Sequence, residues 1–205
     1  MNILLHPTYF PNIATFIAIA KADKIVFEVN DNYQKQTYRN RSYIYAANGK
    51  LQLSIPVIFT QKNRQKYKDV CIANDYKWQD LHWKSLESAY RTSPFFEFYC
   101  DELEPLFKTP FNSILEFNLK CFETICEFLQ IDTSIETTVI YEKEPKNSID
   151  YRFLVNAKKE TPIAVEPYTQ VFNTKHGFIN NLSILDLLFN EGTNALNYLQ
   201  SQDLP

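Results

Sequence analysis

The chain has 205 residues, of which 45% are hydrophobic and 15% aromatic, so it can bury a sizeable core without metal ions or disulfides. It contains only three glycines, which excludes the glycine-rich phosphate loops of P-loop and Rossmann proteins. The net charge of −3 at pH 7 argues against nucleic acid as a partner.

The first thirty residues predict a β-loop-α-β unit. Asn2–Leu5 is a short apolar run that ends at His6-Pro7, as expected for a buried strand stopped by proline. Residues 12–23 have apolar side chains at helical spacing, and Lys24–Val29 is rich in strand-forming residues. Such a unit predicts a pair of parallel strands joined by a right-handed crossover.

The next segment predicts a β-hairpin. Residues 42–47 and 51–58 read as two strands on either side of Asn48-Gly49, a dipeptide typical of tight hairpin turns. A third short strand is predicted at Tyr67–Ile72, after a polar, basic loop. We expect the hairpin and the amino-terminal unit to form one mixed sheet.

The middle of the chain predicts helices, in a helical subregion that spans residues 76–131. Its three periodic segments are 80–93, 95–108 and 111–129. We therefore expect an α/β fold whose amino-terminal sheet is followed by a helical middle and carboxyl-terminal part.

The remainder predicts a strand at 137–141, a long surface loop at 142–166, and a helix at 183–189. The helix ends at Asn190-Glu191-Gly192, a plausible cap, and a short helix to Leu199 follows. No repeat or low-complexity linker divides the sequence, so we expect a single domain over 1–205, with two domains as the alternative.

The sequence also bears on location and redox state. No basic region precedes the first apolar stretch, and no apolar run reaches the roughly 18 residues of a membrane span, so we expect a cytoplasmic protein without a signal peptide or a membrane span. The four cysteines form no CxxC pair, and we expect them to be reduced and mostly buried. They are Cys71, Cys100, Cys121 and Cys126.

The first candidate site is the loop His6–Pro11, between the first strand and the first helix. Ligands of open α/β sheets gather at the carboxyl ends of strands, and helix amino termini favour anions. His6 is then a candidate proton carrier, and Tyr9 a candidate contact to a ligand ring. The alternative is a rigid proline loop with a stacked aromatic.

The second candidate is the segment 30–41, whose side chains are almost all able to form hydrogen bonds. Arginine and lysine suit phosphate, tyrosine rings can stack on a ligand ring, and the remaining polar groups suit a sugar. The alternative is a solvated edge. The candidate binding residues are Asp31, Tyr33, Lys35, Arg39, Asn40 and Arg41.

The third candidate lies on the helix predicted from Asp80, where His82 could act as a general base and Arg91 could contact the substrate. No GxSxG nucleophile motif accompanies them. A histidine between apolar neighbours is more often a satisfied core residue, and that reading is the alternative. Asp186, inside an apolar helix, needs a basic partner such as Arg41 unless it faces solvent.

Four motifs resemble the WbqC-like protein family, in order and over almost the whole chain. They are HPTYFP (6–11), DNYQKQTYRNR (31–41), WQDLHWKSLESAYRTSPFFEFY (78–99) and GFINNLSILDLLFNEG (177–192). The second is the most specific, since many relatives share the residue types found here at Tyr33, Lys35, Tyr38, Asn40 and Arg41. Many relatives have Gln-Pro where this chain has His6-Pro7, so no role of that glutamine is carried over.

The resemblance implies a link to bacterial surface polysaccharides, because some members lie in O-antigen gene clusters that make acylated or aminoacylated amino sugars. Our leading hypothesis is an enzyme that modifies a nucleotide-linked or otherwise anionic sugar, by acyl or aminoacyl transfer. One alternative is a nucleotidylyltransferase-like or adenylate-forming enzyme, although the HxGH motif of those folds is missing. The other is a scaffold protein of envelope assembly that performs no chemistry.

The sequence assigns no cofactor and does not define an oligomeric state. Glu28, Asp31 and Asp186 could hold Mg²⁺ beside phosphates, but their spacing does not require it. We therefore predict no metal site.

Overall fold

The computed structural model describes residues 1–60 and 64–204. Its amino-terminal unit is the predicted one: β1 (Asn2–Leu5), α1 (Ile13–Ile19) and β2 (Lys24–Phe27). The strands β1 and β2 are parallel, with Ile3 opposite Ile25. Helix α1 begins where the Asn12 side chain accepts a hydrogen bond from the backbone N–H of Thr15 (3.0 Å), a typical amino-terminal cap.

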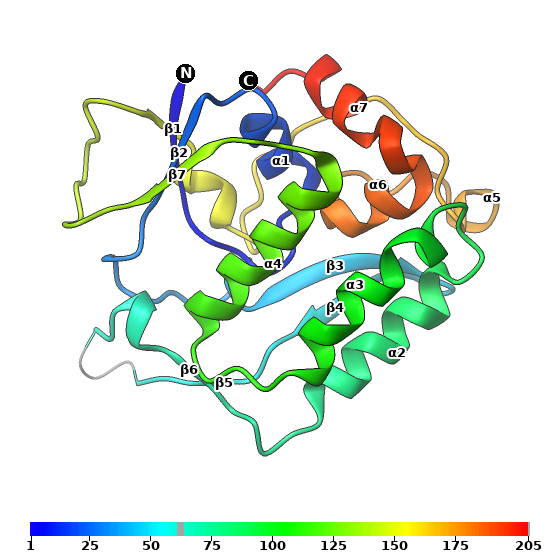
Figure 1. Ribbon diagram of the computed structural model, residues 1–205, viewed down its shortest axis with the longest axis horizontal. Coiled ribbons are helices and arrows are strands. Elements are labelled where there is room, and N and C mark those ends of the chain that lie inside the picture. The colour runs from blue at the N-terminus through cyan, green and yellow to red at the C-terminus, as the bar shows by residue number, and fades with distance from the viewer. Residues whose placement is uncertain (61–63, 205) are drawn as a thin grey trace.

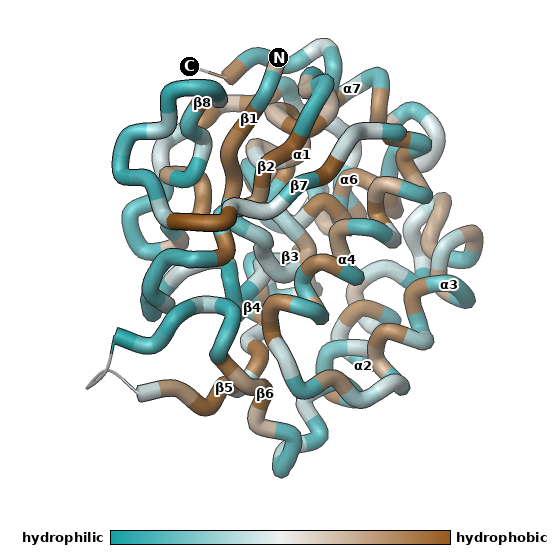
Figure 2. The backbone as a smooth tube through the Cα atoms, turned by 60° about the vertical axis from the view of Figure 1, so that its left-hand side comes forward, coloured by the Kyte–Doolittle hydropathy of each residue, from teal (hydrophilic) through white to brown (hydrophobic). Residues whose placement is uncertain are grey.

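The parallel sheet has four strands in the order β7-β2-β1-β8 (Figures 1 and 2). Strand β7 (Ser134–Thr137) pairs with β2, and the two-residue strand β8 (Ile149–Asp150) pairs with the other edge of β1. The chain thus adds strands on one side of β1 and then returns to its other side. This reversal makes the carboxyl ends of β1 and β8 a topological switch point, the usual place for a ligand in such sheets.

The strand predicted at 137–141 is wrong in position, because β7 ends where that segment begins. The Thr138 side chain bonds to Glu28 (2.9 Å), and the exposed residues 139–141 leave the sheet. The predicted surface loop at 142–166 is interrupted by β8 and by a 3₁₀ turn at Arg152–Val155. A two-residue strand has too little periodicity to be detected in sequence.

The predicted hairpin is present as β3 (Arg41–Ala46) and β4 (Gly49–Ser54), joined by a turn at Ala47-Asn48. Gly49, which begins β4, has a φ of +99°. It forms a sheet of its own and does not join the parallel sheet. Backbone groups of β3 instead bond to the Tyr90 hydroxyl (3.0 Å, from the Tyr45 N–H) and to the Ser183 N–H (2.8 Å, at the Tyr43 carbonyl).

Proline divides the second predicted strand of the hairpin. Pro56 lacks an N–H for the ladder, and it separates β4 from β5 (Val57–Ile58). Strand β5 pairs with β6 (Cys71–Ile72), so the strand predicted at 67–72 exists only at its end. Its first part is a 3₁₀ turn at Tyr67–Asp69.

The predicted helices of the middle part are confirmed as α2 (Trp78–Tyr90), α3 (Phe96–Lys108) and α4 (Ile114–Leu129). Helix α4 starts at Ser113, whose hydroxyl accepts the Glu116 N–H, and ends at Gln130 in the left-handed conformation. With α1, it covers one face of the parallel sheet, where the Phe122 ring meets the edge of Phe27 at 4.9 Å (Figure 1). Figure 2 shows this interior as hydrophobic and the loop from β7 to β8 as largely hydrophilic.

The carboxyl-terminal part contains α5 (Asn173–His176), α6 (Ile184–Glu191) and α7 (Ala195–Ser201). Gly192 ends α6 with a φ of +54°, and a Cβ there would lie 2.5 Å from the Phe95 ring, so both backbone and space require glycine. The cap predicted at Asn190-Glu191-Gly192 is therefore confirmed. Most of the buried hydrophobic residues, from Ile3 to Leu199, form one cluster.

The segment just before α6 completes the loop that follows β1. The Ile13 N–H bonds to the Leu182 carbonyl (3.0 Å), and the Ile184 N–H bonds to the Pro11 carbonyl (2.9 Å). The Asn181 side chain accepts the Ala14 N–H (2.9 Å). Residues near the carboxyl end thus hold the loop that carries His6.

Within the described residues, none of the helices is long and apolar enough to cross a membrane.

Candidate functional site

Ionisable side chains meet at the carboxyl ends of three parallel strands. His6 follows β1, Glu28 follows β2, and Arg152 lies two residues beyond the end of β8. His6 Nδ1 lies 3.4 Å from the Glu28 carbonyl oxygen, and Arg152 Nη1 lies 3.6 Å from Glu28 Oε2. The strand order therefore concentrates charge at the switch point of the sheet.

Asp31 and Arg39 from the second motif join this group. Arg39 Nη2 lies 2.5 Å from Asp31 Oδ2, and 3.1 and 3.2 Å from the two ring nitrogens of His6. Arg39 is fully buried, and His6 and Asp31 are 8% and 7% exposed. We call these three residues, together with Glu28, the strand-end cluster.

Tyr67 and Asn118 support the strand-end cluster through hydrogen bonds. The Tyr67 hydroxyl donates to the Pro7 carbonyl (2.8 Å), and its ring lies 5.1 Å from the Arg39 guanidinium carbon. The Asn118 amide of α4 donates to the Arg39 carbonyl and to the Tyr67 hydroxyl, both at 2.7 Å. These bonds fix the backbone on either side of the cluster.

Several polar atoms of the cluster are buried without a hydrogen-bond partner among the described residues. They are Asp31 Oδ1, Glu28 Oε2, and Arg39 Nε and Nη1. Each such atom costs about 1–3 kcal/mol of desolvation, and folded proteins tolerate few of them. Their concentration at strand ends is more typical of a site that a ligand completes than of a structural core.

Burial sets the protonation of the cluster. Desolvation, reinforced by the Arg39 charge, lowers the pKa of His6 well below its ordinary value, so the imidazole is neutral at pH 7. Desolvation also raises the pKa of Asp31 to about 6, against the opposing attraction of Arg39. A neutral histidine can accept a proton, as a general base must.

The second motif also lines a cavity of about 540 Å³, which we call the cationic pocket. Its lining residues are Tyr33, Lys35, Gln36, Asn40, Arg41, Ser54, Ile55, Pro56, Val57 and Phe59. Two of these are cations, and no acidic side chain of the described residues lines the pocket. Such a lining favours an anionic ligand.

Local structure explains how these side chains come together. Arg41 begins β3 opposite Ser54. Just before it, Asn40 forms two hydrogen bonds with Ile55. Its side-chain amide donates to the Ile55 carbonyl (3.0 Å), and its backbone carbonyl accepts the Ile55 N–H (2.8 Å). The Lys35 ammonium lies 4.8 Å above the Phe59 ring, whose centroid is 5.0 Å from that of Tyr33.

Tyr33 connects the cationic pocket to the strand-end cluster. Its ring centroid is 6.3 Å from that of Tyr67, on which the Arg39 guanidinium rests. Burial raises the pKa of Tyr33 to about 12, while the charges of Arg39 and Arg41 act to lower it. The Tyr33 side chain thus interacts electrostatically with Arg39 of the cluster and with Arg41 of the pocket.

The structure places Tyr9 and His82 elsewhere, in the aromatic core. The Tyr9 hydroxyl bonds to His82 Nδ1 (2.9 Å), and both side chains are buried beside Trp78 and Phe117. Burial lowers the pKa of His82 to about 4, so it too is neutral at pH 7. Neither residue lines the cationic pocket, and a role for them in the chemistry stays a prediction.

Arg91 and Asp186 also lie apart from the cluster and the pocket. Arg91 is exposed at the end of α2. Asp186 is fully buried, but the expected basic partner is replaced by two tyrosine hydroxyls and an amide. Its donors are Tyr90 (2.8 Å), Tyr168 (2.5 Å) and Gln170 (2.8 Å).

Sequence reasoning did not identify Tyr67, Asn118 and Arg152 as residues of the site. Arg152 lies in a segment that reads as a loop, and nothing in its neighbourhood marks it. Asn118 had one signal, because it is a polar residue on the buried face of an otherwise apolar helix. Tyr67 belongs to a stretch that was expected to be a strand.

No group of three His, Cys, Asp or Glu in the described residues is arranged to hold a metal ion. Asp186 is engaged by its tyrosines and glutamine, so it does not join Glu28 and Asp31 at the strand ends. Among the cysteines, two are buried, Cys100 is partly exposed and Cys71 is exposed.

Comparison with known proteins identifies the family. The model of the WbqC-like protein family matches residues 6–162, most of the chain. A protein of Mycobacterium tuberculosis (strain ATCC 25618 / H37Rv), described as uncharacterized protein Rv1507c, is 25% identical over 223 residues, covering 96% of each chain. No solved structure matches significantly. The matched region contains the strand-end cluster and the cationic pocket, and the chain belongs to the WbqC-like protein family.

Proposed function

We propose that this protein is an enzyme that binds a nucleotide-linked or otherwise phosphorylated sugar and transfers an acyl or aminoacyl group to it. The reaction would serve the synthesis of a bacterial surface polysaccharide, and we expect it to occur in the cytosol. The observation that carries the proposal is the cationic pocket, which Lys35 and Arg41 line together with two aromatic rings, while no acidic side chain of the described residues lines it.

The lining of the pocket suits the parts of such a ligand. Arg41 can bind a phosphate through two parallel N–H donors, and Lys35 adds a point charge. The rings of Tyr33 and Phe59 offer apolar faces to a base or to the faces of a sugar. Asn40 and Gln36 supply amide groups for sugar hydroxyls.

His6 is the group that we assign to proton transfer. An amine or hydroxyl of the sugar attacks the acyl carbon of the donor, and His6 takes the proton that this nucleophile loses. The bond between the acyl carbon and its leaving group then breaks, and the proton passes from His6 to that leaving group. Arg39, beside His6, stabilises the negative charge on the acyl oxygen.

Isothermal titration calorimetry with UDP-N-acetylglucosamine tests the binding step. We expect Arg41→Ala to weaken binding at least about tenfold, since it removes a charge-assisted contact worth about 1.5–3 kcal/mol. Arg91→Ala is the matched variant, because it removes an exposed arginine outside the pocket. Equal losses in the two variants, or an Arg41→Ala protein that binds like the parent, would contradict the proposal.

The same titration addresses the alternative of a scaffold protein without chemistry. A scaffold has no reason to bind a nucleotide-linked sugar. If UDP-sugars with different hexoses, UDP alone and pyrophosphate all fail to bind at millimolar concentration, the proposed function is wrong.

A further inference from the structure

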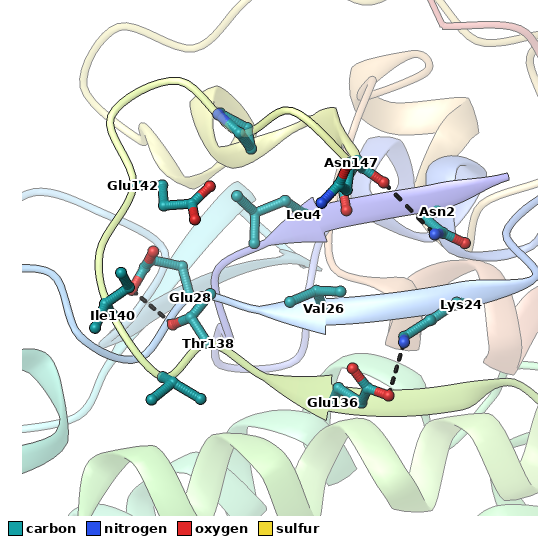
Figure 3. Close-up of a pocket in the computed structure, with 13 residues that line it drawn as sticks. Asn2, Leu4, Lys24, Val26, Glu28, Glu136, Thr138, Ile140, Glu142 and Asn147 are labelled. Atoms are coloured by element: carbon teal, nitrogen blue, oxygen red, sulfur yellow. Dashed lines mark hydrogen bonds and ion pairs between the residues drawn. The ribbon is translucent and has the colours of Figure 1, made fainter.

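A second cavity lies on the other face of the parallel sheet, beneath the loop of residues 138–148 (Figure 3). Its volume is about 340 Å³, near the lower end of the range for small-molecule sites. We call it the sheet pocket. Its lining residues are Asn2, Leu4, Lys24, Val26, Glu28, Glu136, Thr138, Val139, Ile140, Glu142, Pro145, Asn147 and Ser148.

The sheet pocket has an apolar middle and two different ends. Leu4 and Val26 project from β1 and β2 into its middle (Figure 3). At one end Lys24 and Glu136 form an ion pair (2.7 Å), so the positive charge there is already matched. Glu28 and Glu142 lie together at the other end.

Glu28 lines this end of the pocket and has one carboxylate oxygen without a hydrogen bond. It is fully buried, and its Oε1 accepts bonds from the Asn30 N–H (2.7 Å) and the Thr138 hydroxyl (2.9 Å). Its Oε2 accepts no hydrogen bond from the described residues. A buried carboxylate oxygen in this state favours a ligand that can donate to it.

Arg152 forms an ion pair with this oxygen but donates no hydrogen bond to it. Its Nη1 lies 3.6 Å from Glu28 Oε2 and donates to the Glu142 carbonyl (2.8 Å). Its Nη2 donates to the Lys143 carbonyl (3.0 Å) and to Asp150 (2.7 Å). Arg152 thus fastens the loop over the pocket and leaves Glu28 Oε2 without a hydrogen bond.

Glu142 adds a second negative charge at the same end. Its side chain is exposed and forms no ion pair with the residues that the structure describes. Two carboxylates beside an apolar floor suit a primary ammonium group on a short aliphatic body, because an ammonium has three donors and one compact charge. An anion would be repelled, and a neutral apolar ligand would leave Glu28 Oε2 unbonded.

We propose that the sheet pocket binds an amino-acid-like group by its ammonium, with the ammonium at Glu28 and Glu142 and the aliphatic part over Leu4 and Val26. Glu28 of the strand-end cluster lines the sheet pocket, and the Arg39 guanidinium rests on Tyr67, which is near Tyr33 of the cationic pocket, so the cluster adjoins both pockets. Resting on the proposed function, this inference makes the transferred group an aminoacyl group whose amine stays charged during transfer.

Ligand-observed NMR with butylammonium as the probe tests the inference, with butan-1-ol and butyrate as neutral and anionic counterparts of the same length. We expect butylammonium to bind at least about tenfold more tightly than either, since only it forms charge-assisted bonds. Equal binding of the three probes, or no binding of butylammonium, would overturn the inference.

Variants locate the binding. Val26→Phe fills the middle of the pocket, and Glu28→Gln removes the buried charge; each should abolish or strongly weaken butylammonium binding. Glu142→Gln changes an exposed side chain without risk to folding, and we expect a loss of about threefold or more. Glu144→Gln is its matched control, an exposed glutamate of the same loop that does not line the pocket. Equal losses of butylammonium binding in Glu142→Gln and Glu144→Gln would contradict the placement of the ammonium beside Glu142.

The test separates this inference from the proposed function. Arg41→Ala should leave butylammonium binding unchanged, because Arg41 lines only the cationic pocket. Binding of UDP-N-acetylglucosamine without binding of butylammonium would overturn the sheet pocket and leave the proposed function standing. The reverse result would overturn the proposed function and leave the amine site in place.

Discussion

Asp31 and Asp186 are both buried carboxylates, but their surroundings differ. Asp186 accepts three hydrogen bonds from neutral groups: two tyrosine hydroxyls and an amide. Asp31 faces the cation Arg39, and one of its own oxygens and two Arg39 nitrogens have no partner among the described residues. The hydrogen-bonding capacity of Asp186 is met by the protein, whereas Asp31 belongs to a cluster with unpaired polar atoms.

The comparison shows that burial alone does not mark a functional acid. Desolvation raises the pKa of both carboxyl groups. Of the two, only Asp31 lies beyond the ends of the parallel strands and next to a histidine. Unmet hydrogen bonds at a position where the fold admits ligands are the better indicator.

The largest effect is expected when Asp186 is removed. Asp186→Ala leaves two buried tyrosine hydroxyls and the Gln170 amide without their acceptor, which should lower the free energy of unfolding by about 3 kcal/mol. Urea unfolding measures this. Asp132→Ala, an exposed aspartate, is the control and should change stability by less than about 0.5 kcal/mol. A loss below about 1 kcal/mol for Asp186→Ala would mean that the network is dispensable.

The next effect is a dependence of stability on pH that comes from Asp31. Its folded pKa of about 6 exceeds the unfolded value near 3.9, so the folded protein binds the extra proton between these values. The contribution of Asp31 to the stability of the folded protein is fully present below about pH 4 and is lost as the pH rises through 6. Relative to Asp31→Asn, the parent should lose about 2 kcal/mol over that interval.

Unfolding at pH 4, 5, 6 and 7, in the parent and in Asp31→Asn, measures this difference. His6 has the opposite effect, because its lowered pKa makes the folded protein less stable as the pH falls below 6.5. Both proteins contain His6, so its contribution largely cancels in the comparison. Parallel curves for the two proteins would show that Asp31 does not titrate in this range.

The smallest effect on stability is expected from Arg39→Lys, which we compare with Arg152→Lys. Arg39→Lys keeps the positive charge beside Asp31 and removes nitrogens that form no hydrogen bond in the unliganded protein. It should therefore lower the free energy of unfolding by about 1 kcal/mol and weaken nucleotide-sugar binding. Arg152→Lys loses bonds to two loop carbonyls and should cost about 2 kcal/mol. Urea unfolding ranks the two, and the reverse order would show that the idle nitrogens of Arg39 are engaged in the free protein.

Much of the fold could be predicted from local signals. Asn48-Gly49 placed the hairpin, and apolar spacing placed α2, α3 and α4. The parallel pair followed from the order of strand and helix. Strand β8 and the separation of the hairpin from the sheet could not be predicted, because both depend on contacts between residues far apart in sequence, such as Ile3 with Ile149.

The candidate site was only partly visible in the sequence. The dense polar run of the second motif is the segment that lines the cationic pocket, with Tyr33, Lys35, Asn40 and Arg41. Nothing in the sequence separated Arg39, which turns into the protein, from Arg41, which lines the pocket, although they are two residues apart. Side chains at alternate positions share a face only in a regular strand, and Arg39 precedes β3.

The backbone bonds of Leu182 and Ile184 bear on the order of events during synthesis. The His6–Pro11 loop is synthesised well before its partners in this segment. Domains assemble from the amino terminus as they are made, so β1, α1 and β2 can pair while that loop is still open. The step that closes it then waits until Leu182 and Ile184 have been made, and a nascent chain that stops before Leu182 cannot complete the site.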